Sequence, residues 1–470
     1  MTIVSPTSII RNALNTRADV AHSAVETRSC HSWKMSLDRA NVLPQIENFA
    51  GGPPFQLYLR DGIGARISDV DGNWFIDLSM GLGAQILGHG VQAVQDAVLA
   101  QATRGWQDGL ANDGEIALAR HIQTASAANE RVVFCNSSAE ATVTAIRAAR
   151  AFAGRSAIGV FAGSLHGMHP PGLAENDLSV GSPSPTGAAP APAPAPAEVS
   201  GLFGRPWGRA AHRSNDLPAK AAEPGAELIY GDASAFEQIR RGRHHLAAVI
   251  VEPVRARDPG FEHADWLRGL AQVCREAGVL LILDERHTGF RLAFGGAQER
   301  LGLFADLVVY GENIGGGLPL GAVAGRADVL SEFARRESVA RDARPTGGNI
   351  LSLAAGAATL EHLAARRATL YPALEEKGRL LAESFNKFAE SSGLPAKMRA
   401  GGSIFRMCFA HAAAETAFYT IVLSKGLLMH PSRLGFLSIA HTMDDIAYIG
   451  QIFRDALTDV RDDGRFEPKG

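Results

Sequence analysis

Residues 279–285 read VLLILDE, five consecutive apolar residues followed by two carboxylates. Four other short apolar runs lie between residues 131 and 311: RVVFC (131–135), AIGVF (157–161), LAAVIVEP (246–253) and ADLVVYG (305–311). They are rich in Val, Ile and Leu and do not alternate apolar with polar residues, which is typical of strands buried on both faces of a parallel sheet. The five runs therefore predict the central sheet of the protein.

Helical patterns separate these runs, at residues 91–105, 139–154 and 266–278. Strands that alternate with helices are typical of α/β proteins, in which helices cover both faces of the sheet. We therefore predict an α/β fold with a mostly parallel, doubly wound sheet. The alternating pattern extends from about residue 91 to residue 330.

The sequence on either side of this region has other patterns. Short β-type runs flank the DGN turn at residues 71–73, which predicts a hairpin. Residues 356–389 read as a long helix, and residues 403–409 and 435–442 as strands. Residues 183–200, PSPTGAAPAPAPAPAEVS, predict an exposed loop, because proline lacks the backbone donor that helices and sheets use.

The composition narrows the functional class. A chain of 470 residues suggests more than one domain. A net charge of -3, from 46 basic and 49 acidic residues, argues against nucleic acid or a membrane surface as a partner. No run of about 18 apolar residues is present. The four cysteines, Cys30, Cys135, Cys274 and Cys408, form no close pair that would indicate zinc or disulfides, so a cytoplasmic location is expected.

Several segments, taken in order, resemble one enzyme family. They are NSSAEATVTAIRAAR at 136–150, SLHGMHP at 164–170, LLILDERHTGFR at 280–291, GENIGGGLPLGAVAG at 311–325 and PTGGNILSLAAGAATLE at 345–361. Together they resemble the class III, fold-type I aminotransferases that use pyridoxal phosphate (PLP), and most closely the glutamate-1-semialdehyde aminomutase branch. The resemblance extends from about residue 50 to residue 455.

This resemblance implies a domain arrangement and a type of partner. Residues 91–330 would form the large α/β domain. Residues 46–90 and 331–470 would form a smaller domain built from both ends of the chain, preceded by a loosely ordered extension over residues 1–45. Proteins of this family are homodimers with active sites at the interface, so we expect a homodimer that acts on a small molecule.

The resemblance also places the family's Schiff-base lysine at Glu312, by alignment on the glycine run that follows it. Glutamate has no amine, so it cannot hold PLP covalently. The nearest lysines in the chain are Lys220 and Lys377. We therefore expect no covalently bound cofactor, and we leave non-covalent binding of PLP or pyridoxamine phosphate (PMP) open as an alternative.

Other positions also lack groups that the family uses to bind the cofactor. Ser138 and Ala139 stand where the phosphate loop of the family has Gly-Thr, which removes one hydroxyl. Pro345 stands at the phosphate threonine that the partner subunit supplies, although Thr346 follows it. Leu165 replaces an aromatic residue that stacks on the cofactor ring.

Arg286 stands where the family has a valine against the ring. An unpaired buried charge costs several kcal/mol, so Arg286 needs an acidic partner. We predict an ion pair between Arg286 and Glu312 in the space of the pyridine ring.

The remaining polar residues define the candidate site. We predict that a buried acid–base cluster is catalytic, because burial and neighbouring charges move the pKa values of such side chains toward neutrality. Its members are Asp284, Arg286, His287, Glu312 and His166. A vestigial cofactor site comprises Asn136, Ser137, Ser138, Ala139, Asp284 and Thr346. Substrate-binding candidates are Glu285, His169, His430 and Arg433. No metal is expected at the HxxH pair His166 and His169, since the family has histidines there without one.

The sequence leaves three possible functions open. The preferred one is a repurposed enzyme that performs PLP-independent isomerase, lyase or cyclase chemistry on a small amino or keto acid in specialised biosynthesis. The second is an aminomutase or transaminase-like enzyme that binds PLP or PMP non-covalently. The third is an inactive pseudoenzyme or scaffold. The charged cluster favours an enzyme, because an inert pocket is often at least as stable with apolar residues.

Overall fold

The structure is a computed structural model that describes residues 57–106, 111–164, 166, 227–334, 347–430 and 432–466. The predicted N-terminal extension and the Ala/Pro-rich loop at 183–200 lie outside the described residues. Four of the positions discussed above lie outside them too: Leu165, His169, Pro345 and Thr346.

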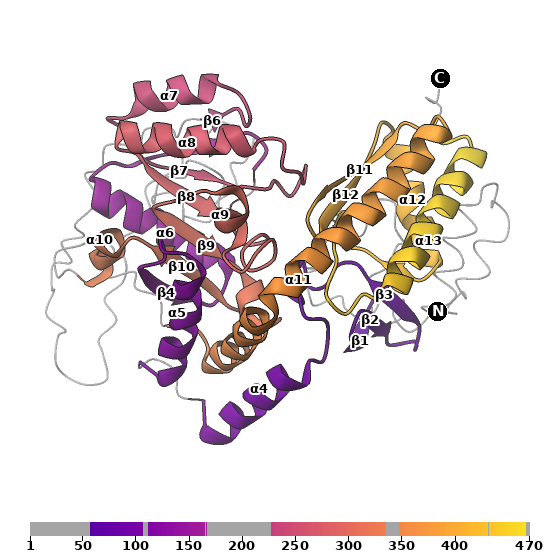
Figure 1. The fold of residues 1–470 in the computed structure, drawn as a ribbon, viewed down its shortest axis with the longest axis horizontal. Coiled ribbons are helices and arrows are strands. Elements are labelled where there is room, and N and C mark those ends of the chain that lie inside the picture. The colour runs from indigo at the N-terminus through magenta and orange to yellow at the C-terminus, as the bar shows by residue number, and fades with distance from the viewer. Residues whose placement is uncertain are drawn as a thin grey trace, which may run out of the picture.

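A seven-stranded sheet forms the larger of two lobes, with the strand order β4-β10-β9-β8-β7-β5-β6 (Figure 1). The strands are β4 (Arg131–Cys135), β5 (Ala157–Phe161), β6 (Glu227–Leu228), β7 (Leu246–Val251), β8 (Leu280–Asp284), β9 (Leu307–Tyr310) and β10 (Gly321–Gly325). The strands from β6 to β9 pair in parallel, and β10 is antiparallel to both of its neighbours. All five strands predicted from the apolar runs are confirmed. The sequence did not reveal β10, because its five residues are small and begin and end with glycine.

Helices cover both faces of this sheet. Alternate residues of β8 point to different cores: Leu281 and Leu283 pack in the cluster that includes helix α8 (Ala264–Ala277), whereas Ile282 packs with helix α6 (Ser138–Ala153). The doubly wound α/β prediction is therefore confirmed. The other elements of this lobe are α4 (Gln92–Arg104), α5 (Asp113–Ala125), α7 (Ser234–Gly242), α9 (Gly296–Leu301), η2 (Glu312–Gly315), α10 (Ala327–Leu330) and η3 (Ser331–Ala334).

The smaller lobe combines both ends of the described chain. Strands β1 (Leu59–Ile63), β2 (Arg66–Asp69) and β3 (Trp74–Asp77) form one sheet with β13 (Leu427–Leu428), which pairs in parallel with β3. A second sheet contains β11 (Ala396–Gly401), β12 (Ile404–Phe409) and β14 (Leu434–Phe436). The predicted hairpin is confirmed, since β2 and β3 are antiparallel on either side of residues 71–73. The strand predicted at 435–442 is wrong beyond Phe436, where β14 ends.

One long helix connects the lobes. Helix α11 (Ile350–Ser391) has 42 residues and extends from the large sheet to the smaller lobe, where α12 (Ala412–Ser424) and α13 (Met443–Asp462) pack (Figure 1). Asn349 begins α11, because its side chain accepts hydrogen bonds from the backbone N–H groups of Leu351 and Ser352. None of the described helices combines the length and the apolar character needed to cross a membrane.

Candidate functional site

The carboxyl ends of neighbouring strands bring the candidate residues together. Strands β7 and β8 are parallel with Val251 opposite Leu283, so the next residues, Glu252 and Asp284, extend from adjacent strand ends. Strand β9 is parallel to β8 on its other side, and Glu312 begins η2 just after β9 ends. Ligand sites of open α/β sheets lie at this edge. The topology therefore places three acidic residues where such proteins bind ligands.

Asp284 is the centre of a buried cluster. Its Oδ2 atom accepts hydrogen bonds from His166 Nδ1 at 2.8 Å and from Arg286 Nη2 at 2.7 Å. The Nε atom of Arg286 lies 3.2 Å from both carboxylate oxygens. Burial alone would raise the pKa of Asp284, but the Arg286 guanidinium and the His166 hydrogen bond hold that pKa well below its usual range. Asp284 is therefore ionised at neutral pH.

Arg286 balances the negative charge of Asp284 and also lies near the carboxylate of a second acidic residue, Glu252. Its Nη2 atom lies 4.0 Å from Glu252 Oε1. Burial and the neighbouring Asp284 raise the pKa of Glu252. Burial opposes the charge of Arg286, but Asp284 and Glu252 keep the pKa of the guanidinium above its ordinary value.

Arg286 and Glu312 do not form the direct ion pair that was predicted, although the charge of Glu312 contributes to the raised pKa of Arg286. Among the described residues, the carboxylates within 4.0 Å of the Arg286 guanidinium belong to Asp284 and Glu252. Arg286 follows Asp284 by two residues at the same strand end, so its side chain folds back onto that carboxylate. Glu312 has a different partner.

The carboxylate of Glu312 faces the N-terminus of α6. The hydroxyl of Ser138 donates to Glu312 Oε1 at 3.3 Å, and the backbone N–H of Ser138 lies 3.5 Å from the same oxygen. Ser137 is the N-cap of α6 and accepts from the backbone N–H of Glu140. Helix N-termini attract anions, because their N–H groups lack helical partners and the macrodipole is positive there. We refer to residues 136–139 as the anion-binding loop, because a carboxylate of the chain itself lies against the donors of Ser138.

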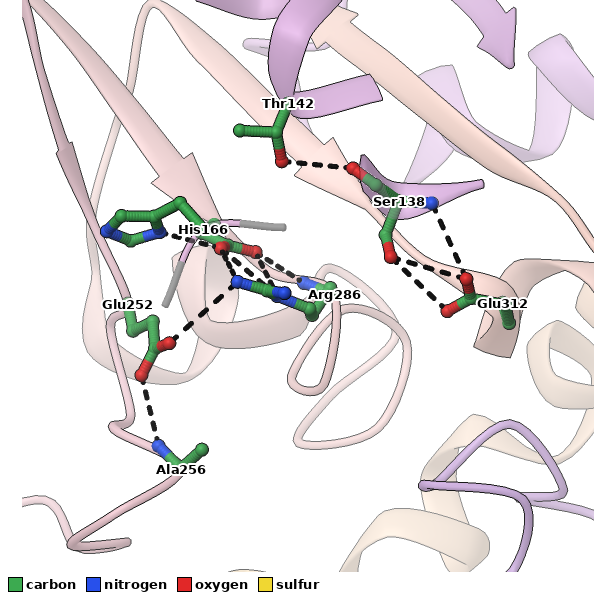
Figure 2. A network of polar contacts seen from close by, with 8 residues as sticks. Ser138, Thr142, His166, Glu252, Ala256, Arg286 and Glu312 are labelled. Atoms are coloured by element: carbon green, nitrogen blue, oxygen red, sulfur yellow. Dashed lines mark hydrogen bonds and ion pairs between the residues drawn. The ribbon is translucent and has the colours of Figure 1, made fainter. Parts of the chain in front are cut away.

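Two groups of contacts make up this site. His166, Glu252 and Arg286 gather in one group, and Ser138 and Glu312 form a second group beside it (Figure 2). The first group holds a cation against carboxylates, whereas the second holds a carboxylate against N–H and O–H donors.

The close approach of β10 to the anion-binding loop requires a glycine. A Cβ atom at Gly321 would lie 2.2 Å from the carbonyl oxygen of Ser137 and 2.9 Å from the nitrogen of Ser138. Backbone atoms cannot come this close to a side chain, so any larger residue would push the strand and the loop apart. The only special feature of this glycine in the sequence is its place in the glycine-rich segment 311–325.

Two neighbours of Asp284 have other surroundings. Glu285 is fully buried and accepts hydrogen bonds from the backbone N–H groups of Ala297 and Gln298, so its carboxylate holds the start of α9. The ring of His287 packs 5.7 Å from that of Phe436. Burial and the charge of Arg286 lower the pKa of His287 to about 4, which makes this imidazole neutral at physiological pH. A substrate contact of Glu285 and a catalytic role of His287 stay predictions.

The two C-terminal candidates contact residues of their own lobe. His430 follows β13, and its Nδ1 atom lies 2.9 Å from the hydroxyl of Ser432. Arg433 forms an ion pair with Glu415, and its guanidinium lies over the ring of Tyr419 at 5.4 Å. Substrate binding by His430 and Arg433 stays a prediction.

Glu252 is the residue that the sequence analysis missed. It follows a fully buried strand, as Asp284 does, and this shared position at a strand end was the available signal. His166, Glu252 and Asp284 bring potential metal-ligand atoms within 4.8 Å of one another. The Arg286 guanidinium already contacts both acids of this trio, so it supplies the positive charge that a metal ion would bring.

Comparisons with known proteins agree on one family. Residues 50–445 match the family described as "Aminotransferase class-III". A glutamate-1-semialdehyde 2,1-aminomutase from Thermomicrobium roseum is 36% identical over 85% of this chain and 90% of its own length. An omega-transaminase structure from Sphaerobacter thermophilus has a TM-score of 0.73, with 25% identity over 92% of this chain and 98% of that one. A structure described as a transaminase with PLP bound has a TM-score of 0.73, with 27% identity over 93% and 99% of the two chains.

These findings confirm the fold-type I prediction and correct two others. The preferred interpretation, a repurposed enzyme that works without PLP, is wrong, because the similar proteins are aminotransferases and an aminomutase, and one of them is a transaminase with PLP bound. The expectation that there is no cofactor, with PLP or PMP doubtful, is wrong for the same reason. Departures at single positions such as Glu312 and Arg286 do not outweigh a family match that extends over residues 50–445.

Proposed function

We propose, from the premise that this chain belongs to the class-III aminotransferase family, that it binds PLP or PMP and acts as an aminomutase or transaminase-like enzyme on a small amino or keto acid. The observation that supports this most directly is the pair of opposite charges at one edge of the sheet. Ionised Asp284 suits a protonated ring nitrogen, and the anion-binding loop suits a phosphate.

The described residues fit such a cofactor at both ends. The Glu312 carboxylate already uses the donors of Ser138 as an anion would, so it stands in for a phosphate oxygen. The guanidinium on Asp284 likewise stands in for a cationic ring nitrogen. His166 Nε2 is buried and has no hydrogen-bond partner among the described residues, which leaves one polar atom of the site open to a ligand.

The side chains divide the work of such a site. When bound, the cofactor supplies an electron sink for amino-group chemistry. Asp284 would hold the ring nitrogen and is itself oriented by His166, while Ser137 and Ser138 would hold the phosphate. Glu312 would supply a carboxylate for acid–base chemistry at the position that the resemblance gives to the family's lysine.

Cofactor binding in this protein would be non-covalent. Glu312 begins η2, directly before the buried Asn313 and Ile314, at the position that the sequence resemblance gives to the family's lysine. The chain has no lysine between residues 221 and 376. Affinity would therefore depend on the hydrogen bonds and charges of Asp284 and the anion-binding loop.

We also infer that the protein is a homodimer. Helix α4 has no buried residue, and two large apolar side chains on and next to it, Leu99 and Trp106, are 64% and 70% exposed. A mostly apolar cavity of about 460 Å³ lies beside this helix, lined also by Gly316 and Thr359. Exposed apolar side chains beside an apolar cavity are typical of a protein–protein contact.

Binding of PLP and PMP to the purified protein tests the proposal. We expect both to raise the melting temperature in a saturable way, since a ligand at about 100 times its Kd adds roughly 2.7 kcal/mol of stability. Asp284→Asn keeps the shape but removes the charge, so it should weaken binding at least tenfold by losing a charge-assisted hydrogen bond. Asp328→Asn, at an exposed position on α10, is the matched control and should change nothing.

Amino-group transfer is then measured with ¹⁵N-labelled amino donors and a panel of small keto acids, by mass spectrometry of the products. The proposal fails if neither PLP nor PMP stabilises the protein, or if both bind equally well to the wild type and to Asp284→Asn.

A further inference from the structure

Both charged ends of the proposed cofactor site are already bonded to the chain itself. Arg286 lies on Asp284 at one end. At the other end, Glu312 lies on Ser138 (Figure 2). The two occupants carry the same signs of charge as the two ends of the cofactor, a cation on the carboxylate and an anion on the helix N-terminus. They are therefore positioned to compete with the ligand.

The cation end is held by short contacts. Asp284 Oδ2 accepts from Arg286 at 2.7 Å and from His166 at 2.8 Å, so a further short hydrogen bond to this oxygen would replace one of them. The side chain of His166 is 5% exposed, whereas that of Arg286 is 14% exposed and has Glu252 as a second counter-ion 4.0 Å away. Arg286 can therefore leave Asp284 more easily than His166 can, because the carboxylate of Glu252 would still lie near its positive charge.

The anion end is held more loosely. The three contacts from Ser138 to the Glu312 carboxylate measure 3.3 to 3.5 Å, longer than the usual 2.7–3.2 Å of a protein hydrogen bond. Glu312 is only partly buried, so water can take over its hydrogen bonds when it leaves. A phosphate would offer more charge and more acceptor oxygens to the same donors.

We propose that Arg286 and Glu312 are internal occupants of the cofactor site, and that PLP or PMP binds by displacing Arg286 from Asp284 and Glu312 from Ser138. This inference rests on the proposed function. It accounts for the contacts that compensate Asp284 and the α6 N-terminus within the chain, and it predicts weaker cofactor binding than the same site would show without these two side chains.

Inorganic phosphate tests the anion end without the ring. Glu312→Gln keeps the size of the side chain and removes the charge that competes for Ser138, so phosphate should bind about tenfold more tightly than to the wild type, as expected for one charge-assisted hydrogen bond. Glu140→Gln is the matched control, because it removes a carboxylate from the same first turn of α6 that bonds to the backbone of Asn136 instead. Its phosphate affinity should stay within about twofold of the wild type.

PMP tests the cation end. Arg286→Met keeps an unbranched side chain and frees the acceptor positions on both oxygens of Asp284 that the guanidinium uses. The empty variant should melt at a lower temperature than the wild type, because an uncompensated buried carboxylate is unfavourable. PMP should bind to it about tenfold more tightly and raise its melting temperature more than that of the wild type. Equilibrium dialysis and thermal shift give the two readouts.

The outcomes separate this inference from the proposed function. Equal affinities of the wild type, Glu312→Gln and Arg286→Met for PMP would overturn the displacement while leaving cofactor binding intact. Absence of PMP binding to all three proteins would overturn the proposed function, and displacement by the cofactor with it. A phosphate gain as large in Glu140→Gln as in Glu312→Gln would show a general effect of charge and would also count against displacement.

Discussion

Single buried side chains decide how the stability of this protein responds to pH. Asp284 is ionised against Arg286 and His166, and Glu285 is buried among backbone donors. His441, in the smaller lobe, is fully buried, and its Nδ1 atom accepts the backbone N–H of Ser438 at 3.0 Å. An imidazole that accepts a backbone hydrogen bond and is removed from water is stable only in its neutral form.

The burial of neutral His441 therefore predicts that the folded protein loses stability as the pH is lowered. Burial lowers its pKa in the folded protein to about 4, below the value of about 6.5 in the unfolded chain. Between these values the unfolded state binds a proton that the folded state does not, so the free energy of unfolding falls as the pH is lowered. From about pH 7.5 to about pH 5, this group should cost about 2 kcal/mol.

Urea unfolding of the wild type and of His441→Gln at both pH values measures this contribution. The variant should lose less stability on acidification than the wild type by about that amount. His244→Gln, at an exposed histidine, is the control and should behave as the wild type does. An identical pH dependence of the wild type and His441→Gln would contradict the prediction.

At the scale of elements, the site depends on how closely β10 passes the start of α6. Strand β10 runs antiparallel to β4, with Gly321 opposite Cys135, which places it directly beside the turn from β4 into α6. The anion-binding loop is therefore positioned by a strand that carries no functional side chain. Strand β10 can come this close to the loop because Gly321 has no Cβ atom.

Gly321→Ala should disturb this arrangement. The added Cβ would lie 2.2 Å from the Ser137 carbonyl oxygen, so the loop and the strand must separate, at a cost of roughly 1–3 kcal/mol as for other overpacking substitutions. Phosphate and PMP affinity should fall as well, because the N–H groups of the loop move. Gly450→Ala, in the interior of α13 with only ordinary contacts nearby, should instead be neutral or slightly stabilising.

Urea denaturation and dialysis of both variants check this expectation. If Gly321→Ala unfolded at the same urea concentration as the wild type and kept its phosphate affinity, the positioning role of β10 would be refuted.

At the scale of the whole molecule, α11 connects the large sheet to the smaller lobe, and α4 lies on the outside of the large lobe (Figure 1). A surface helix normally buries an apolar stripe against its own core, and α4 buries no residue completely. Its exposed apolar residues belong to a surface that a second copy of the chain would cover in the proposed homodimer.

Leu99→Asp combined with Trp106→Asp should shift the protein from dimer to monomer. Two charges would have to be buried in the interface without partners, at a cost of several kcal/mol. Light scattering after size-exclusion chromatography measures the mass of each species. Tyr448→Asp, at a 54% exposed position on α13 in the smaller lobe, is the control and should remain a dimer. A wild type that is monomeric at all concentrations would refute the homodimer.

The sequence alone determined five of the seven strands of the large sheet, the doubly wound α/β class and the family, because strands buried on both faces need uninterrupted apolar runs and the family segments occur in order. It also identified Asp284, Arg286, Ser138 and Glu312 as special positions. The tertiary structure decided which of these side chains meet. Ser138 and Glu312 are 174 residues apart and come together through β10 and η2, and Glu252 reaches Arg286 from the neighbouring strand. A local pattern predicts where a side chain is buried, but the partner of a buried charge depends on strand order and register, which only the folded chain fixes.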